Sequence, residues 1–237
     1  MRRVSRFILL ALFSASCLAG PPKFTVVHVD TRREHLELFL YDEAGAPFHR
    51  LEKLDGWLAS QGKRLTFAMN AGMFEPDYSP VGLFIARSRE LSPLNLSSGQ
   101  GNFFMKPNGV FFLTAAGPRI VESSKYRART ADVLLATQSG PLLVEHGAIH
   151  SALSQTSRSR LIRNGVGVTG STAVFVISDE PVTFYELAVY FRDQLNCDDA
   201  LYLDGVVSAL FLPERGRRDS RVDLGPIVGV VQSRFDP

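Results

Sequence analysis

Short apolar segments separated by glycine, proline and asparagine limit the folds open to this chain of 237 residues. Segments such as residues 24–29, 65–69 and 173–178 are rich in valine, isoleucine and phenylalanine, as β-strands usually are. Only residues 51–61 and 183–195 place apolar side chains at clear helical spacing, and the second stretch opens with the Thr-x-x-Glu pattern of a capping box. The sequence therefore predicts an α/β (α+β) fold, a single strand-rich domain with mixed or antiparallel sheets and a few helices.

Two turns predict which neighbouring strands pair. A polar turn separates residues 24–29 from residues 36–41, and we expect these two strands to form a β-hairpin. Gly170 and Ser171 separate two further apolar segments and have the length and composition of a two-residue hairpin turn.

The first residues are typical of an export signal. Residues 1–19 combine three arginines, a short apolar run and small residues near a cleavage point, which predicts a signal peptide. Cleavage before Cys17 would instead give a lipid-anchored lipoprotein. We therefore expect an exported protein, periplasmic or extracellular. No segment reaches the roughly 20 apolar residues that a transmembrane helix requires, and residues 24–232 are expected to form the working domain.

Charge and cysteine content exclude several classes of protein. Lysine and arginine total 26 against 24 acidic residues, so no broad cationic face is expected and a nucleic-acid partner is disfavoured. Loss of residues 1–19 would leave Cys197 as the one cysteine, which prevents an internal disulfide and favours a buried packing role. The histidines lack zinc-ligand spacing, and no nucleotide-binding loop or nucleophile elbow is present. These patterns therefore predict neither a cofactor nor a metal site, while carboxylates such as Asp204 leave open the binding of a hard cation.

Polar side chains follow four of the apolar segments at the point where each ends. Asn70, Gln138, Asp179 and Asp204 each come directly after such a segment. In open α/β sheets, ligands bind outside the carboxyl ends of strands, so these groups could line one acidic cleft. The alternative is that polar residues simply resume wherever a strand ends.

Six motifs together resemble those of a known family. They are, in chain order, Asn70-Ala71-Gly72-Met73-Phe74, Pro80-Val81-Gly82-Leu83, Gly101-Asn102-Phe103-Phe104-Met105-Lys106-Pro107-Asn108-Gly109-Val110-Phe111, Ala136-Thr137-Gln138-Ser139-Gly140-Pro141-Leu142-Leu143-Val144, Arg163-Asn164-Gly165-Val166-Gly167-Val168 and Tyr202-Leu203-Asp204-Gly205-Val206-Val207-Ser208. In this order and spacing they resemble the phosphodiester glycosidase domain family, most closely its bacterial exported branch. The resemblance covers nearly all of residues 24–232. The animal member of that family, the uncovering enzyme, removes N-acetylglucosamine from mannose 6-phosphate diesters.

The resemblance implies a glycosidase similar to a phosphodiester α-N-acetylglucosaminidase, which cleaves a sugar C1–O bond with a phosphate ester as leaving group. Arg163 would bind phosphate oxygens, unless it forms an ordinary surface ion pair. Asp204 would act as base, nucleophile or stabiliser of the oxocarbenium ion, unless it only caps a turn. Glu180 would be the second carboxylate, although it fits equally well as part of the loop before the helix at residue 183.

The remaining candidates would hold a sugar-phosphodiester or glycan substrate. They carry amide, hydroxyl or ammonium groups that can bond sugar hydroxyls or phosphate, and they are Asn70, Gln138, Ser139, Asn108, Lys106 and Ser208. Lys106 fits equally well as a solvated side chain in a turn.

One motif departs from the family pattern, which often has Asp-Gly-Gly-Gly-Ser after the late strand. Here Val206 and Val207 replace two glycines, and β-branched residues disfavour the positive φ angles that glycine allows. A second hypothesis therefore remains, a non-catalytic envelope module that binds glycan or phosphodiester ligands. The sequence predicts neither the sugar nor the oligomeric state.

Overall fold

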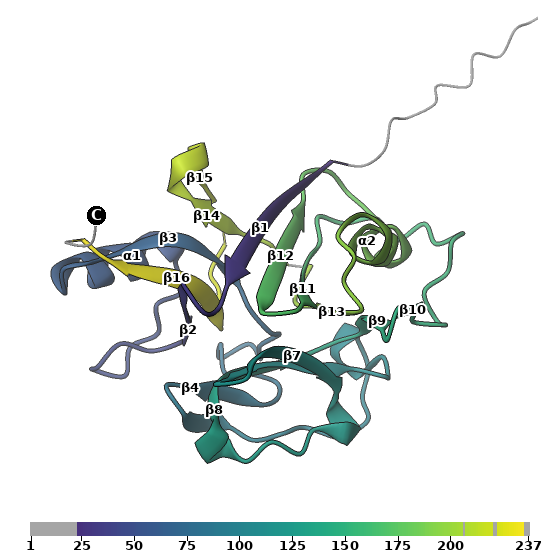
Figure 1. Cartoon of the computed structure of the whole chain (residues 1–237), viewed down its shortest axis with the longest axis horizontal. Coiled ribbons are helices and arrows are strands. Elements are labelled where there is room, and N and C mark those ends of the chain that lie inside the picture. Colours follow the sequence, from purple (N-terminus) through teal and green to yellow (C-terminus); the bar gives the residue numbers. More distant parts are fainter. Residues whose placement is uncertain (1–22, 206, 220–221, 235–237) are drawn as a thin grey trace, which may run out of the picture.

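The structure is a computed structural model that describes residues 23–205, 207–219 and 222–234 (Figure 1). The signal-peptide prediction for residues 1–19 and the substitution at Val206 lie outside the described residues. Strands dominate, and they form three sheets in which every pair of neighbouring strands is antiparallel. The strand-rich prediction is confirmed, but the architecture is mainly β rather than α/β. The physical reason is that hairpins and loops, rather than crossover helices, connect the paired strands.

The first sheet has six strands in the order β1-β12-β11-β13-β9-β10. Their bounds are β1 Phe24–Asp30, β9 Leu142–Glu145, β10 Ala148–Ile149, β11 Asn164–Thr169, β12 Thr172–Ser178 and β13 Asp199–Tyr202. The hairpin predicted around Gly170 and Ser171 is confirmed, because Thr169 pairs with Thr172 across that turn.

The second sheet has five strands in the order β15-β14-β3-β16-β2. Their bounds are β2 His35–Phe39, β3 Lys63–Asn70, β14 Leu210–Leu212, β15 Arg217–Arg218 and β16 Ile227–Ser233. The predicted hairpin of residues 24–29 and 36–41 is wrong, since β1 pairs with β12 and β2 pairs with β16. The turn instead carries the chain from one sheet to another, which lets Val29 and Leu36 enter the same core from both sides.

The third sheet has five strands in the order β5-β4-β8-β6-β7. Their bounds are β4 Phe84–Ala86, β5 Arg89–Ser92, β6 Gly109–Thr114, β7 Gly117–Glu122 and β8 Val133–Ser139. Short 3-10 turns accompany the strands at Asn102–Phe104, Ser123–Lys125, Thr130–Asp132 and Pro213–Arg215.

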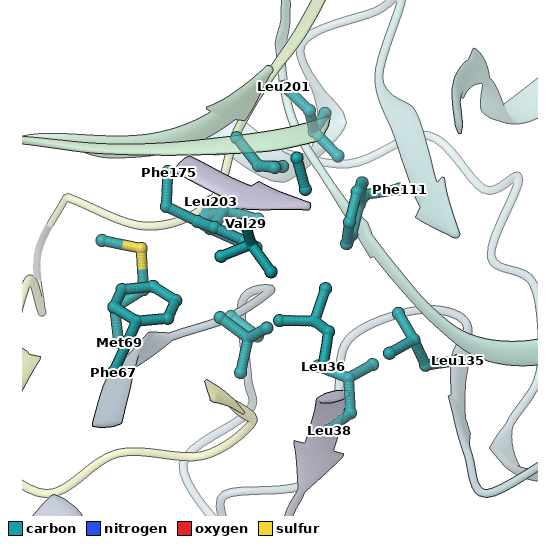
Figure 2. Packing of buried hydrophobic residues seen from close by; sticks show 14 of the residues in the cluster. Val29, Leu36, Leu38, Phe67, Met69, Phe111, Leu135, Phe175, Leu201 and Leu203 are labelled. Carbon is teal, nitrogen blue, oxygen red and sulfur yellow. The ribbon is translucent and has the colours of Figure 1, made fainter. Parts of the chain in front are cut away.

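All three sheets contribute side chains to one central core. Figure 2 shows Phe67 of the second sheet, Phe175 of the first and Phe111 of the third facing a common interior. The ring centroid of Phe175 lies 5.0 Å from that of Phe67 and 6.0 Å from that of Phe111. Burial of these large rings supplies much of the hydrophobic stabilisation and fixes the sheets relative to one another.

Two helices cover the outer faces of the sheets (Figure 1). Helix α1, Leu51–Ser60, buries Leu54 and Leu58 against the second sheet. Helix α2, Phe184–Val189, covers the first sheet and continues as a π-helical turn, Tyr190–Gln194. Neither these helices nor any other in the described part of the chain has the length and hydropathy to cross a membrane.

The thiol of Cys197 is buried below helix α2. It packs close to Gly167 of β11, where a Cβ atom would approach the sulfur to 2.6 Å, so only glycine fits opposite the thiol. Burial raises the pKa of the Cys197 thiol to about 11, and the nearby Asp198 adds to the rise.

We therefore predict that a thiol-specific reagent leaves Cys197 unmodified in the folded protein at about pH 8, because only the thiolate reacts. Addition of denaturant should expose the thiol and restore rapid labelling. Fast labelling of Cys197 in the native protein, read separately from Cys17, would contradict the burial that the structure describes.

The capping box predicted at the start of α2 is confirmed. The Thr183 hydroxyl accepts a hydrogen bond from the Glu186 amide at 3.1 Å, and the Thr183 amide donates to the Glu186 carboxylate at 2.7 Å. These bonds satisfy two helix-terminal groups that would otherwise lack partners.

Replacement of Thr183 by alanine should lower the free energy of unfolding by about 1 kcal/mol, because it removes the side-chain acceptor. Thr183→Ser is the matched control, since it keeps the hydroxyl oxygen. Denaturant titration of both variants measures the difference, and equal losses would show that the cap contributes nothing.

Candidate active site

Two buried amide side chains hold the segment from Asp204 to Ala209, called here the 204–209 segment, at both of its ends. Asn164, the first residue of β11, donates from Nδ2 to Oδ1 of Asn70, the last residue of β3, over 2.6 Å. Asn164 Oδ1 accepts from the Asp204 amide at 2.8 Å, and Asn70 Oδ1 accepts from the Ala209 amide at 3.0 Å. Because backbone amides can only donate, they fix the orientation of both side-chain amides. We call this arrangement the amide clamp.

Gly205 and Ser208, within the 204–209 segment, make further contacts. The Ser208 hydroxyl lies 3.0 Å from the Asp204 carbonyl oxygen and 3.2 Å from that of Ile162, so it can donate to either. A Cβ atom at Gly205 would overlap the Tyr202 hydroxyl, which explains why glycine follows Asp204. Just before the segment, the Ser139 hydroxyl donates to the Leu203 carbonyl oxygen at 2.6 Å.

Gly205, Ser208 and Ala209 of the 204–209 segment form one wall of a cleft of about 660 Å³. Residues from the segment, the end of β12, strand β15 and the adjoining loops line it: Ile162, Ser178, Asp179, Gly205, Ser208, Ala209, Arg217, Arg218, Asp219 and Val222. Asp204 adjoins Gly205 and is nearly buried. Such a volume suits a small ligand. Of the four strand-end polar groups, Asp179 lines this cleft, whereas Asn70 and Asp204 are buried behind it, where Asn70 bonds the lining residue Ala209 and Asp204 precedes Gly205.

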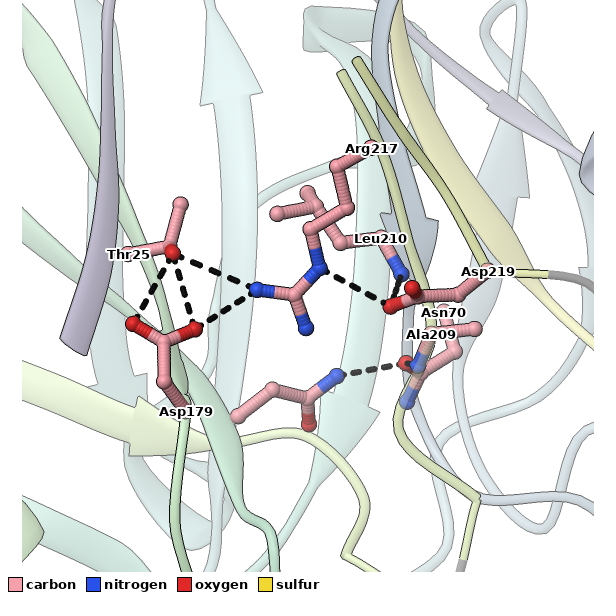
Figure 3. Close-up of polar contacts among 8 residues, drawn as sticks. Thr25, Asn70, Asp179, Ala209, Leu210, Arg217 and Asp219 are labelled. Atoms are coloured by element: carbon pink, nitrogen blue, oxygen red, sulfur yellow. Dashed lines mark hydrogen bonds and ion pairs between the residues drawn. The ribbon is translucent and has the colours of Figure 1, made fainter. Parts of the chain in front are cut away.

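An arginine joins two carboxylates across the cleft (Figure 3). Arg217 Nη1 donates to Asp179 at 2.7 Å and to the Thr25 hydroxyl at 3.2 Å, and Nε donates to Asp219 at 3.1 Å. The Thr25 hydroxyl in turn donates to Asp179 at 2.9 Å, and Asp219 accepts from the Leu210 amide at 3.0 Å. The network ties β1, β12, β14 and β15 together at the rim.

Arg163 lies behind the cleft rather than in its lining. Its side chain is 1% exposed and its guanidinium stacks on the Phe184 ring at 3.8 Å. The guanidinium donates to Val182 and Ser159 oxygens and approaches the Tyr202 hydroxyl at 3.4 Å. Burial raises the pKa of Tyr202, the Arg163 charge opposes that rise and the Asp204 charge adds to it. Tyr202 therefore stays protonated as a neutral link between Arg163 and the 204–209 segment.

The other predicted binding residues lie apart from the cleft. Gln138 is buried, and its amide bonds the Leu83 and Asn95 amides, the Asn95 carbonyl and the Ser123 hydroxyl. Asn108 donates to the Phe103 carbonyl at 2.8 Å, and Lys106 donates to a carbonyl in the same loop region. These three side chains organise the loop between β5 and β6.

Glu180 also lies outside the cleft lining. It is exposed, and its carboxylate accepts a hydrogen bond from the Lys23 amide at 3.2 Å. Its neighbour Asp179 takes the place in the cleft. Across the described residues, no group of three or more histidine, cysteine, aspartate or glutamate side chains has a metal-binding arrangement.

Comparison with known proteins places this chain in a family. A family model described as phosphodiester glycosidase matches residues 63–222, about two thirds of the chain. The chain belongs to the phosphodiester glycosidase family. The matched residues include Asn70, Asn164, Asp204 and Arg217, so the amide clamp and most of the cleft lining fall within the family match.

Two further proteins are similar to this member of the phosphodiester glycosidase family. An uncharacterized protein of Escherichia coli K12, YigE, is 34% identical over 207 residues, which cover 86% of this chain and 81% of YigE. The zebrafish N-acetylglucosamine-1-phosphodiester α-N-acetylglucosaminidase catalytic domain, auto-inhibited by its pro-peptide, superposes with a TM-score of 0.60 at 13% identity. That superposition covers 90% of this chain and 84% of the zebrafish chain, and it shows a shared fold.

Three residues of the site were not predicted from the sequence. Asn164 lies beside Arg163 in the fifth family-like motif, where the neighbouring arginine is the residue whose charge indicates phosphate binding. Arg217 and Asp219 belong to residues 214–223, a stretch of mixed charge that is typical of a solvated surface. Only the pairing of β15 with β14 brings them to the cleft.

The amide clamp predicts strong energetic coupling between Asn70 and Asn164. Asn164→Ala would leave the buried Asp204 amide without its acceptor, at a cost of about 1–3 kcal/mol in the free energy of unfolding. Asn70→Ala should lower the free energy of unfolding by a similar amount, because it leaves the Ala209 amide without its acceptor. The double variant should lose less than the sum, because the bond between the two side chains is lost only once. Strictly additive losses in denaturant titrations would contradict the clamp.

Proposed function

We propose that this protein is a hydrolase that cleaves the glycosidic C1–O bond of a sugar linked to phosphate. Membership of the phosphodiester glycosidase family supports the proposal, as does a cleft that combines carboxylates with guanidinium groups. The observation that carries it is the amide clamp, which holds the backbone amides of Asp204 and Ala209 and so supports the part of the cleft wall that Gly205, Ser208 and Ala209 form.

The chemistry of the leaving group matches these residues. A phosphate monoester leaves C1 readily, so the reaction depends more on charge stabilisation and positioning than on a general acid. We assign Asp204 to the sugar side, where its carboxylate would stabilise positive charge at C1 or activate water. Arg163 would support this group indirectly, through Tyr202, rather than by contact with the phosphate.

We further propose that the reaction takes place in the bacterial cell envelope. The support is the export-signal pattern of residues 1–19, together with the E. coli relative. The substrate would be a sugar phosphodiester or a glycan that contains one, and the zebrafish relative makes N-acetylglucosamine the first sugar to test.

Asp204→Asn should reduce hydrolysis of an N-acetylglucosamine 1-phosphate methyl diester by at least about a hundredfold, because it removes the charge and keeps the shape. Asp193→Asn is the matched control, since Asp193 is exposed and pairs with Arg192 on the π-helical turn away from the cleft. Release of the free sugar measures activity. Unchanged turnover in Asp204→Asn would refute the assignment of Asp204.

A second candidate function is ligand binding without turnover. It is favoured by Val207, which stands where the family often has glycine and packs, partly buried, against the cluster of α1 and the second sheet. A panel of sugar phosphodiesters that bind but are never cleaved, also after Val207→Gly, would support this candidate over the enzyme.

A further inference from the structure

The proposed function requires a group that meets the phosphate, and this inference rests on that function. Arg163 does not suit the task. Each guanidinium nitrogen already faces an oxygen of Val182, Tyr202 or Ser159, and one face is covered by a ring. A phosphate could reach it only by displacing these contacts.

Arg217 has the geometry that Arg163 lacks. Its side chain lines the cleft and is 25% exposed. Nε and Nη1 are held by Asp219 and Asp179, while Nη2 makes no hydrogen bond to any residue that the structure describes. Figure 3 shows this third nitrogen of the Arg217 guanidinium without a dashed line. Because the two aspartates already hold the guanidinium in place, it loses little conformational entropy when Nη2 binds an anion.

The carboxylates that hold Arg217 also limit the charge of the anion. Among the described lining residues, Arg217 and Arg218 balance Asp179 and Asp219, and the nearly buried Asp204 lies next to the lining. Arg218 also stacks over the Phe211 ring at 4.8 Å. A phosphodiester brings a single negative charge, whereas a phosphomonoester carries about 1.5 to 2 near pH 7 because its second pKa is about 6. The second charge would face both carboxylates at close range, where like charges repel.

We propose that Arg217 Nη2 is the phosphate donor of the cleft, and that Asp179 and Asp219 make the site selective for monoanionic phosphodiesters over dianionic phosphomonoesters. Hydrolysis adds the hydroxyl of water to C1 and its proton to the departing phosphate oxygen. The diester thereby becomes a monoester, which loses a further proton above about pH 6. The product is then the species that the site binds poorly, so the same residues that hold the substrate favour release of the product.

The test measures binding with small probes and does not require turnover. Diethyl phosphate and ethyl phosphate are titrated into the full chain and followed by NMR. The diester should bind equally well from about pH 5 to pH 7, while the monoester should bind roughly tenfold more weakly at pH 7, where only about a tenth retains its second proton. Equal pH dependence of the two probes would overturn the selectivity.

Three variants separate recognition from structure. Arg217→Lys keeps the charge but removes the free edge, and it should weaken diester binding about tenfold. Asp219→Asn keeps an acceptor for the Leu210 amide but removes one repelling charge, so it should strengthen monoester binding at neutral pH. Arg129→Lys is the control, because Arg129 pairs with Asp132 on an exposed turn. Denaturant titration confirms folding of each variant.

The outcomes also separate this inference from the proposed function. Unchanged diester binding in a folded Arg217→Lys variant, or unchanged monoester binding in Asp219→Asn, would refute the inference. Hydrolysis that persists in either case would leave the function intact. Binding that follows the expectation while no sugar diester is cleaved would support the inference and refute the enzyme.

Discussion

The bond between Asn70 and Asn164 is the interaction on which the site depends. The two residues stand at the end of β3 and the start of β11, which belong to different sheets. Each amide oxygen also accepts a backbone amide of the 204–209 segment. The junction between the sheets and the shape of that segment are therefore one structure, and neither can shift without breaking bonds in a buried environment where water cannot replace them.

The same clamp bears on Val207, the described part of the segment's departure from the family pattern. Glycines allow many backbone conformations in a turn. In this segment, hydrogen bonds from Asn164 and Asn70 hold the backbone amides at the two ends. Within the described part of the segment, contact requires glycine at position 205, because the Tyr202 hydroxyl occupies the space of a side chain. Val207 gains contacts with the α1 cluster instead. External hydrogen bonds thus replace part of the local preference that glycine supplies.

The sequence predicted the positions of helices and turns better than it predicted which strands pair. The helix at α1, the capping box and the β11–β12 turn follow from local spacing and were found where expected. The pairing of β1 with β12 depends on burial of Val29 and Leu36 from two sheets, a long-range effect that no turn reveals. For the candidate site, strand-end polarity pointed to Asn70 and Asp204, which meet at the 204–209 segment, but also to Gln138, whose hydrogen bonds serve a loop. Sheet packing decides whether a buried amide bonds that segment or a loop, and residue type does not encode this.

The two arginines show why charge alone does not locate a ligand. Arg163 lies in one of the family-like motifs, yet each of its guanidinium nitrogens donates to a carbonyl or hydroxyl oxygen, and the Phe184 ring covers one face. It therefore acts as a buried support. Arg217 stands in a charged stretch typical of solvent-exposed chain, yet the pairing of β15 with β14 brings it beside Asp179 and Asp219. Two carboxylates occupy two of its edges and leave the third for a ligand. The residue that can bind is the one whose hydrogen bonds are incomplete, and only the three-dimensional arrangement of its neighbours reveals which one that is.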